Sequence, residues 1–306
     1  MIDQQLIAVE PRSNALYEAA ITAVGGKVAP LSSSVGALIW TDYYDVRGLE
    51  RAIELNPQLQ WVQLPFAGVD AFESVLQHPI RFTSAKGSYR EPVAEHALML
   101  CMALGRKLPE RIRATSWGEK FAVSLYDANV VIVGAGGITD ELLGLLKPFR
   151  SKVTVVRNQG AVAVPGADQT LGLEQLATVL PTAQFVILAC ALTPKTRGLV
   201  NSELLAKFDP AAYLVNIARG PIVVTEDLLD ALAGGKLAGA GIDVTDPEPL
   251  PEGHPAWDEP RLIVTPHTAD TPQIVADKFS IRLRENVCAY LGSGEWVGLV
   301  DPKLGY

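Results

Sequence analysis

The stretch VVIVGAGGITDELLGLLKPF, residues 130–149, decides the fold of this 306-residue chain. It begins with an apolar run, typical of a parallel strand covered on both faces, and continues past Gly134 and Gly136 into a segment with helical spacing of leucines. In such a unit, the first glycine permits a tight turn and the second lets the backbone approach a pyrophosphate at the helix N-terminus. The pattern therefore predicts a dinucleotide-binding strand–turn–helix.

Two positions depart from the usual form of this motif. Thr139 stands where a third glycine normally allows the helix and strand to pack closely, and this weakens the pattern. Arg157 ends the next expected strand, where an acidic residue would bind the adenosine 2′-hydroxyl. An arginine suits a 2′-phosphate, through a charge-assisted contact worth roughly 1.5–3 kcal/mol. We therefore expect NADP(H) to be preferred; the alternative is NAD(H), with Arg157 projecting into solvent.

The rest of the chain alternates short apolar runs with helical stretches, which is typical of α/β proteins with parallel sheets. A long helix is expected to begin near Pro92, and a last helix is expected from Pro272 to about Tyr290. Strands are expected near residues 6–9, 37–40, 61–64 and 81–83, and then near 129–133, 153–157, 185–189, 212–216, 238–242 and 261–265. The pattern predicts two Rossmann-like or flavodoxin-like lobes with parallel sheets and a cleft between the lobes.

Composition narrows the class of function. The chain is 48% hydrophobic and 20% charged, with a net charge of −8 and no long run of one sign, which argues against a nucleic-acid surface. Three scattered cysteines without a CxxC pair fit a reducing compartment and indicate neither a disulfide framework nor a metal site. There is no signal-peptide pattern and no apolar run of the roughly 20 residues that a membrane span needs. We expect a cytoplasmic protein without membrane contact.

Hydride transfer to a 2-keto acid requires a cation for the carboxylate, an acid for the keto oxygen, and a group that keeps the acid protonated. Arg219 follows the expected strand at 212–216, where ligands bind in open α/β sheets, and its planar guanidinium matches a carboxylate in two bonds. His267 follows the expected strand at 261–265 in the same way. We expect these two residues to be the carboxylate ligand and the acid.

The other three histidines have less favourable positions. His78 precedes a proline in a polar turn, His96 lies within the long helix as a packing or capping residue, and His254 falls in a Pro-rich loop. A histidine with an ordinary pKa near ~6.5 needs a carboxylate to stay protonated at pH 7. Glu248 follows the strand at 238–242 and can serve, but spacing alone leaves Asp246 and Glu252 as competitors.

The motifs together resemble those of the D-isomer-specific 2-hydroxyacid dehydrogenases over nearly the whole chain. The resemblance settles Glu248 over Asp246, with Arg219, Glu248 and His267 as the catalytic set. The short tail ending in GY resembles the glyoxylate/hydroxypyruvate reductase branch. The motifs are WVQLPFAGVD (61–70), PVAEHALML (92–100), VVIVGAGGIT (130–139), LTPKTRGLV (192–200), LVNIARGPIV (214–223), LAGAGIDVTDPEPLP (237–251) and LIVTPHTA (262–269).

The resemblance also implies roles for further residues. It implies a discontinuous substrate-binding domain, 1–94 plus 273–306, and a dinucleotide-binding domain, 95–272. The substrate carboxylate would meet the backbone amides of Ala67, Gly68 and Val69 as well as Arg219. Asp243 would meet the nicotinamide carboxamide. The remaining cofactor contacts would be Gly134, Ala135, Gly136, Gly137, Ile138, Arg157, Asn158, Ala189, Cys190, Ala191, Thr196, Ile217 and Ala218.

The expected function is therefore NAD(P)H-dependent interconversion of a small 2-keto acid and a D-2-hydroxy acid. The resemblance also implies a homodimer formed through the cofactor lobe and its long helix. Two alternatives remain. Formate dehydrogenases share the fold but carry Gln in place of Glu248. A nicotinamide-sensing binding or scaffold protein of the same fold would retain the three catalytic residues without turnover.

Overall fold

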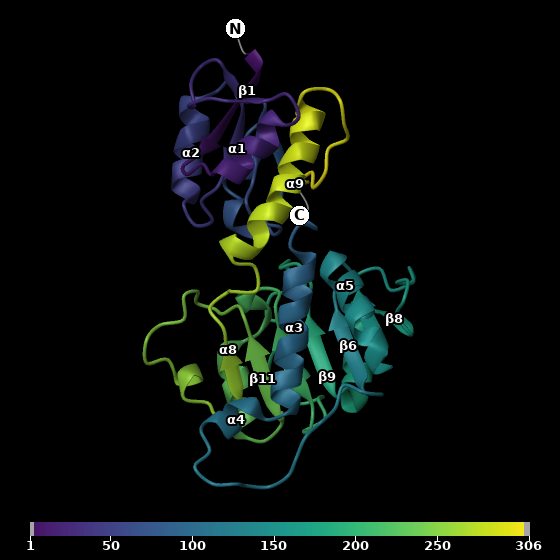
Figure 1. Cartoon of the computed structure of the whole chain (residues 1–306). Coiled ribbons are helices and arrows are strands. Elements are labelled where there is room, and N and C mark those ends of the chain that lie inside the picture. The colour runs from purple at the N-terminus through teal and green to yellow at the C-terminus, as the bar shows by residue number, and fades with distance from the viewer. Residues whose placement is uncertain (1–2, 303–306) are drawn as a thin grey trace. The chain divides into compact units, whose positions relative to one another are not determined.

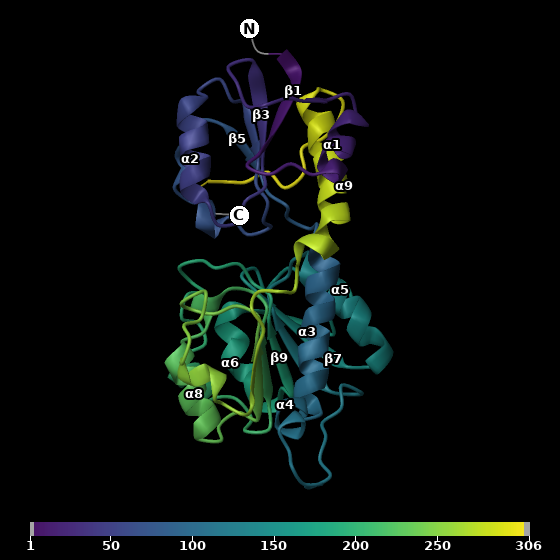
Figure 2. The same ribbon diagram turned by 60° about the vertical axis from the view of Figure 1, so that its left-hand side comes forward.

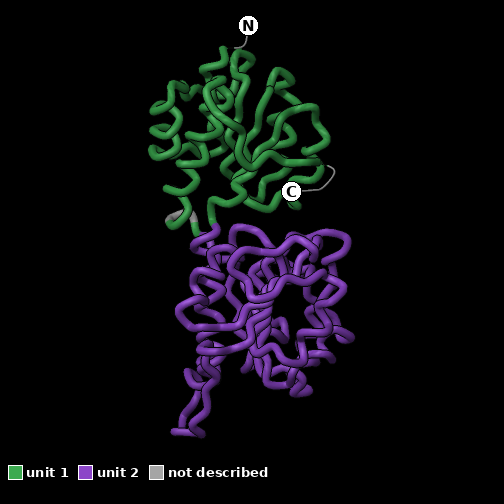
Figure 3. The backbone as a smooth tube through the Cα atoms, turned by 90° about the vertical axis from the view of Figure 1, so that its right-hand side faces the viewer, with its two compact units in different colours: residues 1–89, 271–306 green, residues 90–270 purple. Residues whose placement is uncertain are grey.

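The computed structural model describes residues 3–302, and the chain divides into two compact units. Unit 1 combines residues 1–89 with 271–306, and unit 2 consists of residues 90–270 (Figure 3). The chain therefore passes between the units twice, at 89/90 and at 270/271. The domain boundaries expected from the sequence lay at 94/95 and 272/273.

Unit 1 is a parallel five-stranded sheet covered on both faces by helices. Helices α1 (Ala15–Thr22) and α9 (Pro272–Tyr290) lie on one face, and α2 (Val46–Leu55) lies on the other (Figure 2). The strand order is β2-β1-β3-β4-β5, which is the flavodoxin-like order. The strands are β1 (Asp3–Glu10), β2 (Lys27–Val28), β3 (Val35–Trp40), β4 (Trp61–Gln63) and β5 (Arg81–Thr83), with 3₁₀ turns η1 (Asp70–Phe72) and η2 (Val75–Gln77) between β4 and β5.

The core of unit 1 follows from its apolar patterning. All six residues of β3 are buried, as expected for a parallel strand between two helical layers. The amphipathic α2 turns Leu49 and Ile53 into a cluster with Val35 and Leu38. Asp45 accepts a hydrogen bond from the N–H of Gly48 at the start of this helix and fixes where it begins.

Unit 2 is a parallel seven-stranded sheet in the order β12-β11-β10-β9-β6-β7-β8 (Figure 1). Its strands are β6 (Asn129–Val133), β7 (Lys152–Arg157), β8 (Gln169–Gly172), β9 (Phe185–Leu188), β10 (Tyr213–Asn216), β11 (Gly239–Ile242) and β12 (Leu262–Val264). The direction of winding reverses between β6 and β9. In open α/β sheets, ligands bind outside the carboxyl ends of the strands at such a switch point.

Helices cover both faces of the unit 2 sheet (Figure 2). The long helix α3 (Arg90–Gly105) and α5 (Gly137–Leu146) share one face, and α6 (Leu176–Val179), α7 (Ser202–Leu205) and α8 (Thr225–Ala233) cover the other. After α3, the short helix α4 (Leu108–Ile112) starts an arm that extends from the unit (Figure 3). The 3₁₀ turns are η3 (Lys147–Phe149), η4 (Leu173–Gln175), η5 (Leu180–Thr182), η6 (Gly220–Ile222) and η7 (Pro255–Trp257).

The predicted α/β class with two parallel sheets is confirmed, and each expected strand is present within a few residues of its expected bounds. Two strands were missed. β2 has only two residues, and β8 is a short, half-buried edge strand in which Leu171 is the single large apolar residue, so neither carries an apolar run. Within residues 3–302, no helix has the length and apolar character needed to cross a membrane.

Candidate active site

The glycine-rich turn lies at the switch point of the unit 2 sheet. Gly134 follows β6 with φ 121°, and a side chain there would collide with the carbonyl oxygen of Ala189, which follows β9. Gly136 is exposed, and a Cβ on it would meet nothing within 4 Å. No side chain caps α5, which begins at Gly137, because the N-cap residue is Gly136, which has no side chain to accept from the first N–H groups. These features fit a pyrophosphate at the helix N-terminus.

Thr139 explains how this turn tolerates the loss of its third glycine. Its side chain is fully buried, and its hydroxyl donates a hydrogen bond of 3.0 Å to the carbonyl oxygen of Gly134. The threonine side chain therefore bridges the two ends of the turn, and its buried hydroxyl is satisfied by the Gly134 carbonyl oxygen. The departure from the glycine motif is accommodated without loss of the turn.

The other residues predicted to contact the cofactor follow the carboxyl ends of adjacent strands in this sheet. Arg157 ends β7 half-buried, with Nη1 3.5 Å from the carbonyl oxygen of Val162. The loop after β9 is closed by the Thr196 hydroxyl, which donates to the carbonyl oxygen of Ala191 at 2.7 Å. The remaining positions are Asn158, exposed after β7; Ala135, Gly137 and Ile138, half-buried at the turn; Ala189 and Cys190, half-buried after β9; and Ile217 and Ala218, buried after β10. Their roles toward a cofactor stay predictions.

His267 and Glu248 form a close pair at the carboxyl ends of β12 and β11. His267 Nδ1 lies 2.7 Å from Glu248 Oε1, and the other Glu248 oxygen accepts from the Thr245 N–H at 3.4 Å. The two side chains are 19% and 34% exposed, so the pair is half-buried yet open to solvent. The structure thus brings together the predicted acid and the carboxylate expected to keep it protonated.

The pKa shifts of the pair have the sign that this role requires. Burial alone would lower the pKa of His267, but the hydrogen bond and charge of Glu248, with the charge of Asp270, raise it above the ordinary histidine value. Burial would raise the pKa of Glu248, but the bond to His267 and its charge, the Thr245 N–H and the charge of Arg219 lower it. Both shifts favour the state in which a protonated imidazole faces an ionised carboxylate.

Arg219 stands at the end of the turn after β10. The buried side chain of Asn216 holds this turn, because its Nδ2 donates to the Arg219 carbonyl oxygen at 3.0 Å and its Oδ1 accepts from the Ala218 N–H at 3.1 Å. Arg219 Nη1 donates to the Ala218 carbonyl oxygen at 2.8 Å. The positive charge of Arg219 lowers the pKa of both Glu248 and His267, so the guanidinium interacts electrostatically with both members of the pair. Sequence analysis missed Asn216, which lies within LVNIARG.

Asp270 is an acidic residue of this region that sequence analysis did not consider. Burial raises its pKa to about 6; the charge of His267 opposes that rise, and the charge of Asp243 adds to it. Asp243 follows β11, whereas His267 and Asp270 lie together after β12, so the shift depends in part on a residue distant in the sequence that no local pattern indicated. Asp270 is therefore a second carboxylate acting on His267.

Asp243, predicted to meet the nicotinamide carboxamide, is 2% exposed and already accepts several hydrogen bonds. Oδ1 accepts from the Thr265 hydroxyl at 2.6 Å and the Thr268 N–H at 2.9 Å, and Oδ2 accepts from the Ala269 N–H at 3.1 Å. A carboxylate offers about four acceptor positions, so Oδ2 has room for one further donor. The carboxamide role stays a prediction.

The predicted carboxylate-binding loop, Ala67, Gly68 and Val69, belongs to unit 1 and follows β4. Two hydrogen bonds hold the chain just before this loop: the Ala85 N–H donates to the Phe66 carbonyl oxygen at 2.8 Å, and the Tyr89 hydroxyl donates to the Pro65 carbonyl oxygen at 2.7 Å. The role of this loop and the cleft between the lobes stay predictions.

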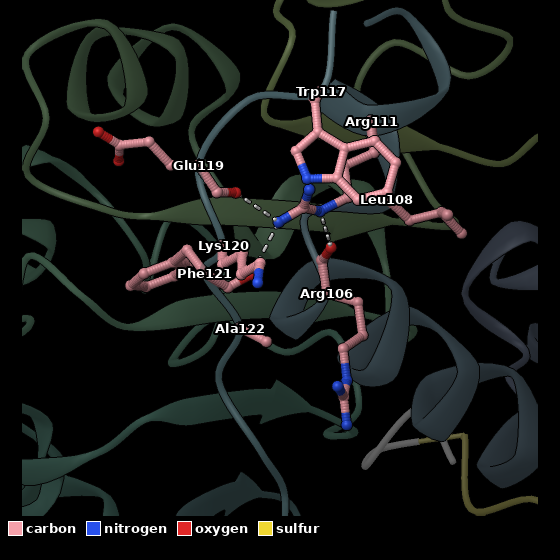
Figure 4. Close-up of a pocket in the computed structure, with 8 residues that line it drawn as sticks. All are labelled: Arg106, Leu108, Arg111, Trp117, Glu119, Lys120, Phe121 and Ala122. Atoms are coloured by element: carbon pink, nitrogen blue, oxygen red, sulfur yellow. Dashed lines mark hydrogen bonds between the residues drawn. The ribbon is translucent and has the colours of Figure 1, made fainter.

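A hollow of about 680 Å³ lies elsewhere on unit 2, in the arm that starts at α4 (Figure 4). The Arg111 guanidinium holds the arm together by donating to the carbonyl oxygens of Arg106, Glu119 and Phe121. None of the predicted site residues lines it. Its lining residues are Arg106, Leu108, Arg111, Trp117, Glu119, Lys120, Phe121 and Ala122.

The fold and the strand-end residues of unit 2 define a nicotinamide-dependent oxidoreductase. Residues 97–269 match the NAD-binding domain of the D-isomer-specific 2-hydroxyacid dehydrogenases, and the chain belongs to this family. It is 30% identical over 261 residues to the human glyoxylate reductase/hydroxypyruvate reductase, which covers 82% of this chain and 79% of the relative.

One further relative and one solved structure agree with this family assignment. The glyoxylate/hydroxypyruvate reductase A of Serratia proteamaculans (strain 568) is 37% identical over 57% of this chain and 55% of the relative. A D-isomer-specific 2-hydroxyacid dehydrogenase of Xanthobacter autotrophicus Py2, solved in complex with NADPH and MES, superposes with a TM-score of 0.85 at 25% identity, covering 98% of this chain and 99% of that one. The chain is accordingly an NAD(P)-dependent 2-hydroxyacid dehydrogenase, as the sequence predicted.

Proposed function

We propose that this enzyme reduces glyoxylate, hydroxypyruvate or a similarly small 2-keto acid, with Arg219, Glu248 and His267 as its catalytic residues. The observation that carries the proposal is the 2.7 Å contact between His267 Nδ1 and Glu248 Oε1 at the carboxyl ends of β12 and β11. The substrate class is supported by the relatives named as glyoxylate/hydroxypyruvate reductases. The reductive direction fits a histidine whose pKa is raised, because such a histidine holds a proton to donate.

In this mechanism each residue has a separate task. Arg219 binds the substrate carboxylate through two parallel hydrogen bonds. Because Glu248 engages Nδ1, protonated His267 donates from Nε2 to the keto oxygen. When bound, the reduced nicotinamide supplies the hydride that reaches C2. Glu248 fixes the imidazole orientation and stabilises its positive charge, and the amides of Ala67, Gly68 and Val69 would bind the same carboxylate from unit 1.

We further propose a preference for NADP(H) over NAD(H). Arg157 ends β7, the strand beside β6 and its glycine-rich turn, and the Gly134 N–H bonds to the Val156 carbonyl oxygen one residue before Arg157. A guanidinium at this strand end suits a 2′-phosphate. The Xanthobacter relative, at 25% identity, was solved with NADPH.

The assay is a panel of 2-keto acids, including glyoxylate and hydroxypyruvate, with NADPH and with NADH, followed by absorbance of the reduced cofactor. We expect turnover of at least one small keto acid, and a higher kcat/KM with NADPH. Tight cofactor binding without turnover of any keto acid would favour the scaffold alternative. A clear preference for NADH would leave the reductase proposal in place and remove the role of Arg157.

We also propose a homodimer formed through α3 and the arm. The arm exposes apolar side chains that a monomer would leave in water: Trp117 is 88% exposed and Ile112 is 74% exposed. Met99 and Met102 on α3 are also exposed. We expect Trp117→Glu to shift the protein from dimer to monomer in sedimentation experiments, and Trp257→Glu, at an exposed tryptophan outside the arm, to leave it a dimer. A dimer that survives Trp117→Glu unchanged would count against this surface.

A further inference from the structure

His267 is held in a backbone conformation that a histidine rarely adopts. Its φ is 51°, in the left-handed region, which costs a non-glycine residue about 1–2 kcal/mol. Its N–H donates to the carbonyl oxygens of Asp243 and Thr265, at 2.8 and 3.0 Å. The next two N–H groups, of Thr268 and Ala269, donate to the Asp243 carboxylate. Strained conformations persist only where the surroundings fix them, and here Asp243 accepts from three successive amides.

Asp243 is itself held by two side chains, one of them from a distant part of the chain. Asp243 Oδ1 lies 2.6 Å from the Thr265 hydroxyl and 3.3 Å from Nε2 of His96 on α3. His96 Nε2 and the Thr265 hydroxyl are 3.0 Å apart, so the three groups contact one another. His96 is only 14% exposed. Sequence analysis assigned His96 to packing or capping, yet its ring nitrogen joins a polar cluster.

The charges within the cluster agree with this geometry. Burial alone would raise the pKa of Asp243, but the hydrogen bonds from His96, Thr265 and the Thr268 N–H, with the charge of His96, lower it. Asp243 therefore stays ionised and accepts the amides of the turn at full strength. His96 lies in the first part of α3, near the start of unit 2, whereas the turn at 267–269 lies near its end.

We propose that His96 is a positioning residue for His267. By holding the Asp243 carboxylate, it keeps the turn at 267–269 in the one conformation in which His267 Nδ1 meets Glu248. The consequence for catalysis rests on the proposed function, whereas the consequence for the pKa of His267 does not. A residue that only filled space between α3 and the sheet would affect stability alone.

The test compares His96→Leu with His96→Gln, whose amide nitrogen can replace the Nε2 donor. The control is His78→Leu, at a histidine of unit 1. The pKa of His267 is followed by NMR of ¹⁵N-histidine-labelled protein without substrate, where four histidines give few signals. In His96→Leu we expect that pKa to fall toward the ordinary value of ~6.5, because the bond to Glu248 loosens. His96→Gln should keep most of the raised value, and His78→Leu should keep all of it.

Steady-state kinetics with the best keto acid give the second readout. We expect His96→Leu to lower kcat about tenfold with little change in KM, as for other partners that orient a functional imidazole. Thr265→Val removes the hydroxyl that donates to Asp243 and should act in the same direction, which keeps the test open if His96→Leu does not fold.

The two readouts separate this inference from the reductase proposal. An unchanged pKa of His267 in the folded variants, His96→Leu or Thr265→Val, would overturn the positioning role even in an active reductase. A lowered pKa of His267 in a protein that reduces no keto acid would support the positioning role and defeat the proposed function.

Discussion

The two units bury polar side chains for different purposes. In unit 1, Gln63, Thr83 and Asn286 are fully buried and neutral, and their hydrogen bonds of 2.8 Å join β4, β5 and α9. In unit 2, the polar residues at the strand ends include ionisable ones, His267 and Glu248, which remain 19% and 34% exposed with shifted pKa values. A neutral network specifies packing without holding charge, whereas charged groups at an open sheet edge can exchange protons with a ligand.

The largest effect should come from removing the proposed acid. His267→Gln keeps a polar side chain but cannot donate a proton from a charged ring, so kcat should fall by about 10²–10⁴-fold. Because the pair with Glu248 is partly solvent-exposed, the free energy of unfolding should change by at most about 1 kcal/mol. Kinetics and thermal unfolding measure the two quantities. His254→Gln is the control, and equal turnover in both variants would remove His267 from its role.

A substitution in the polar network of unit 1 should lower the stability of the protein and leave kcat unchanged, the reverse of the effect expected at His267. Asn286 donates to Gln63 and also exchanges two hydrogen bonds with the backbone of Val297. Asn286→Ala leaves buried partners unsatisfied, and each costs roughly 1–3 kcal/mol, while kcat per folded molecule should stay unchanged. Urea unfolding and kinetics at low temperature measure both. Gln77→Ala truncates an exposed amide of the same unit as a control. A loss of kcat without a loss of stability would contradict the distinction between the units.

Features set by neighbouring residues could be predicted from the sequence, whereas contacts between distant residues could not. Gly134, the apolar strands and the residues just after them follow local patterns, so the fold class was predictable and Arg219 and His267 could be named as candidates. Spacing did not separate Glu248 from Asp246 and Glu252, and the family resemblance was needed to choose it. The contact of His96 with Asp243 and Thr265 joins positions far apart in the chain, and no local spacing indicates it. β8 was missed because this four-residue edge strand, QTLG, lacks an apolar run.

The smallest expected effect tests whether Asp270 acts on the site through its charge. Its pKa of about 6 is above the ordinary value near 3.9, so folding favours its protonated form. The stabilising contribution is therefore complete below about pH 3.9 and is lost as the pH rises through about 6. Above that pH the folded protein holds an unfavourable charge, and Asp270→Asn should raise Tm at pH 8 by a few degrees, corresponding to about 1 kcal/mol, but not at pH 4.

The same substitution should also move the pH dependence of catalysis. The groups that act on His267 are Glu248, Asp270 and Arg219; the first two raise its pKa, and Arg219 lowers it. Asp270→Asn removes one of the two negative charges, so kcat/KM for reduction should begin to fall at a lower pH than in the parent enzyme. Asp258→Asn, at an exposed aspartate, should change neither the pH profile nor Tm. If Asp270→Asn leaves the pH profile in place while raising Tm, Asp270 affects folding without contributing to the charge balance at His267.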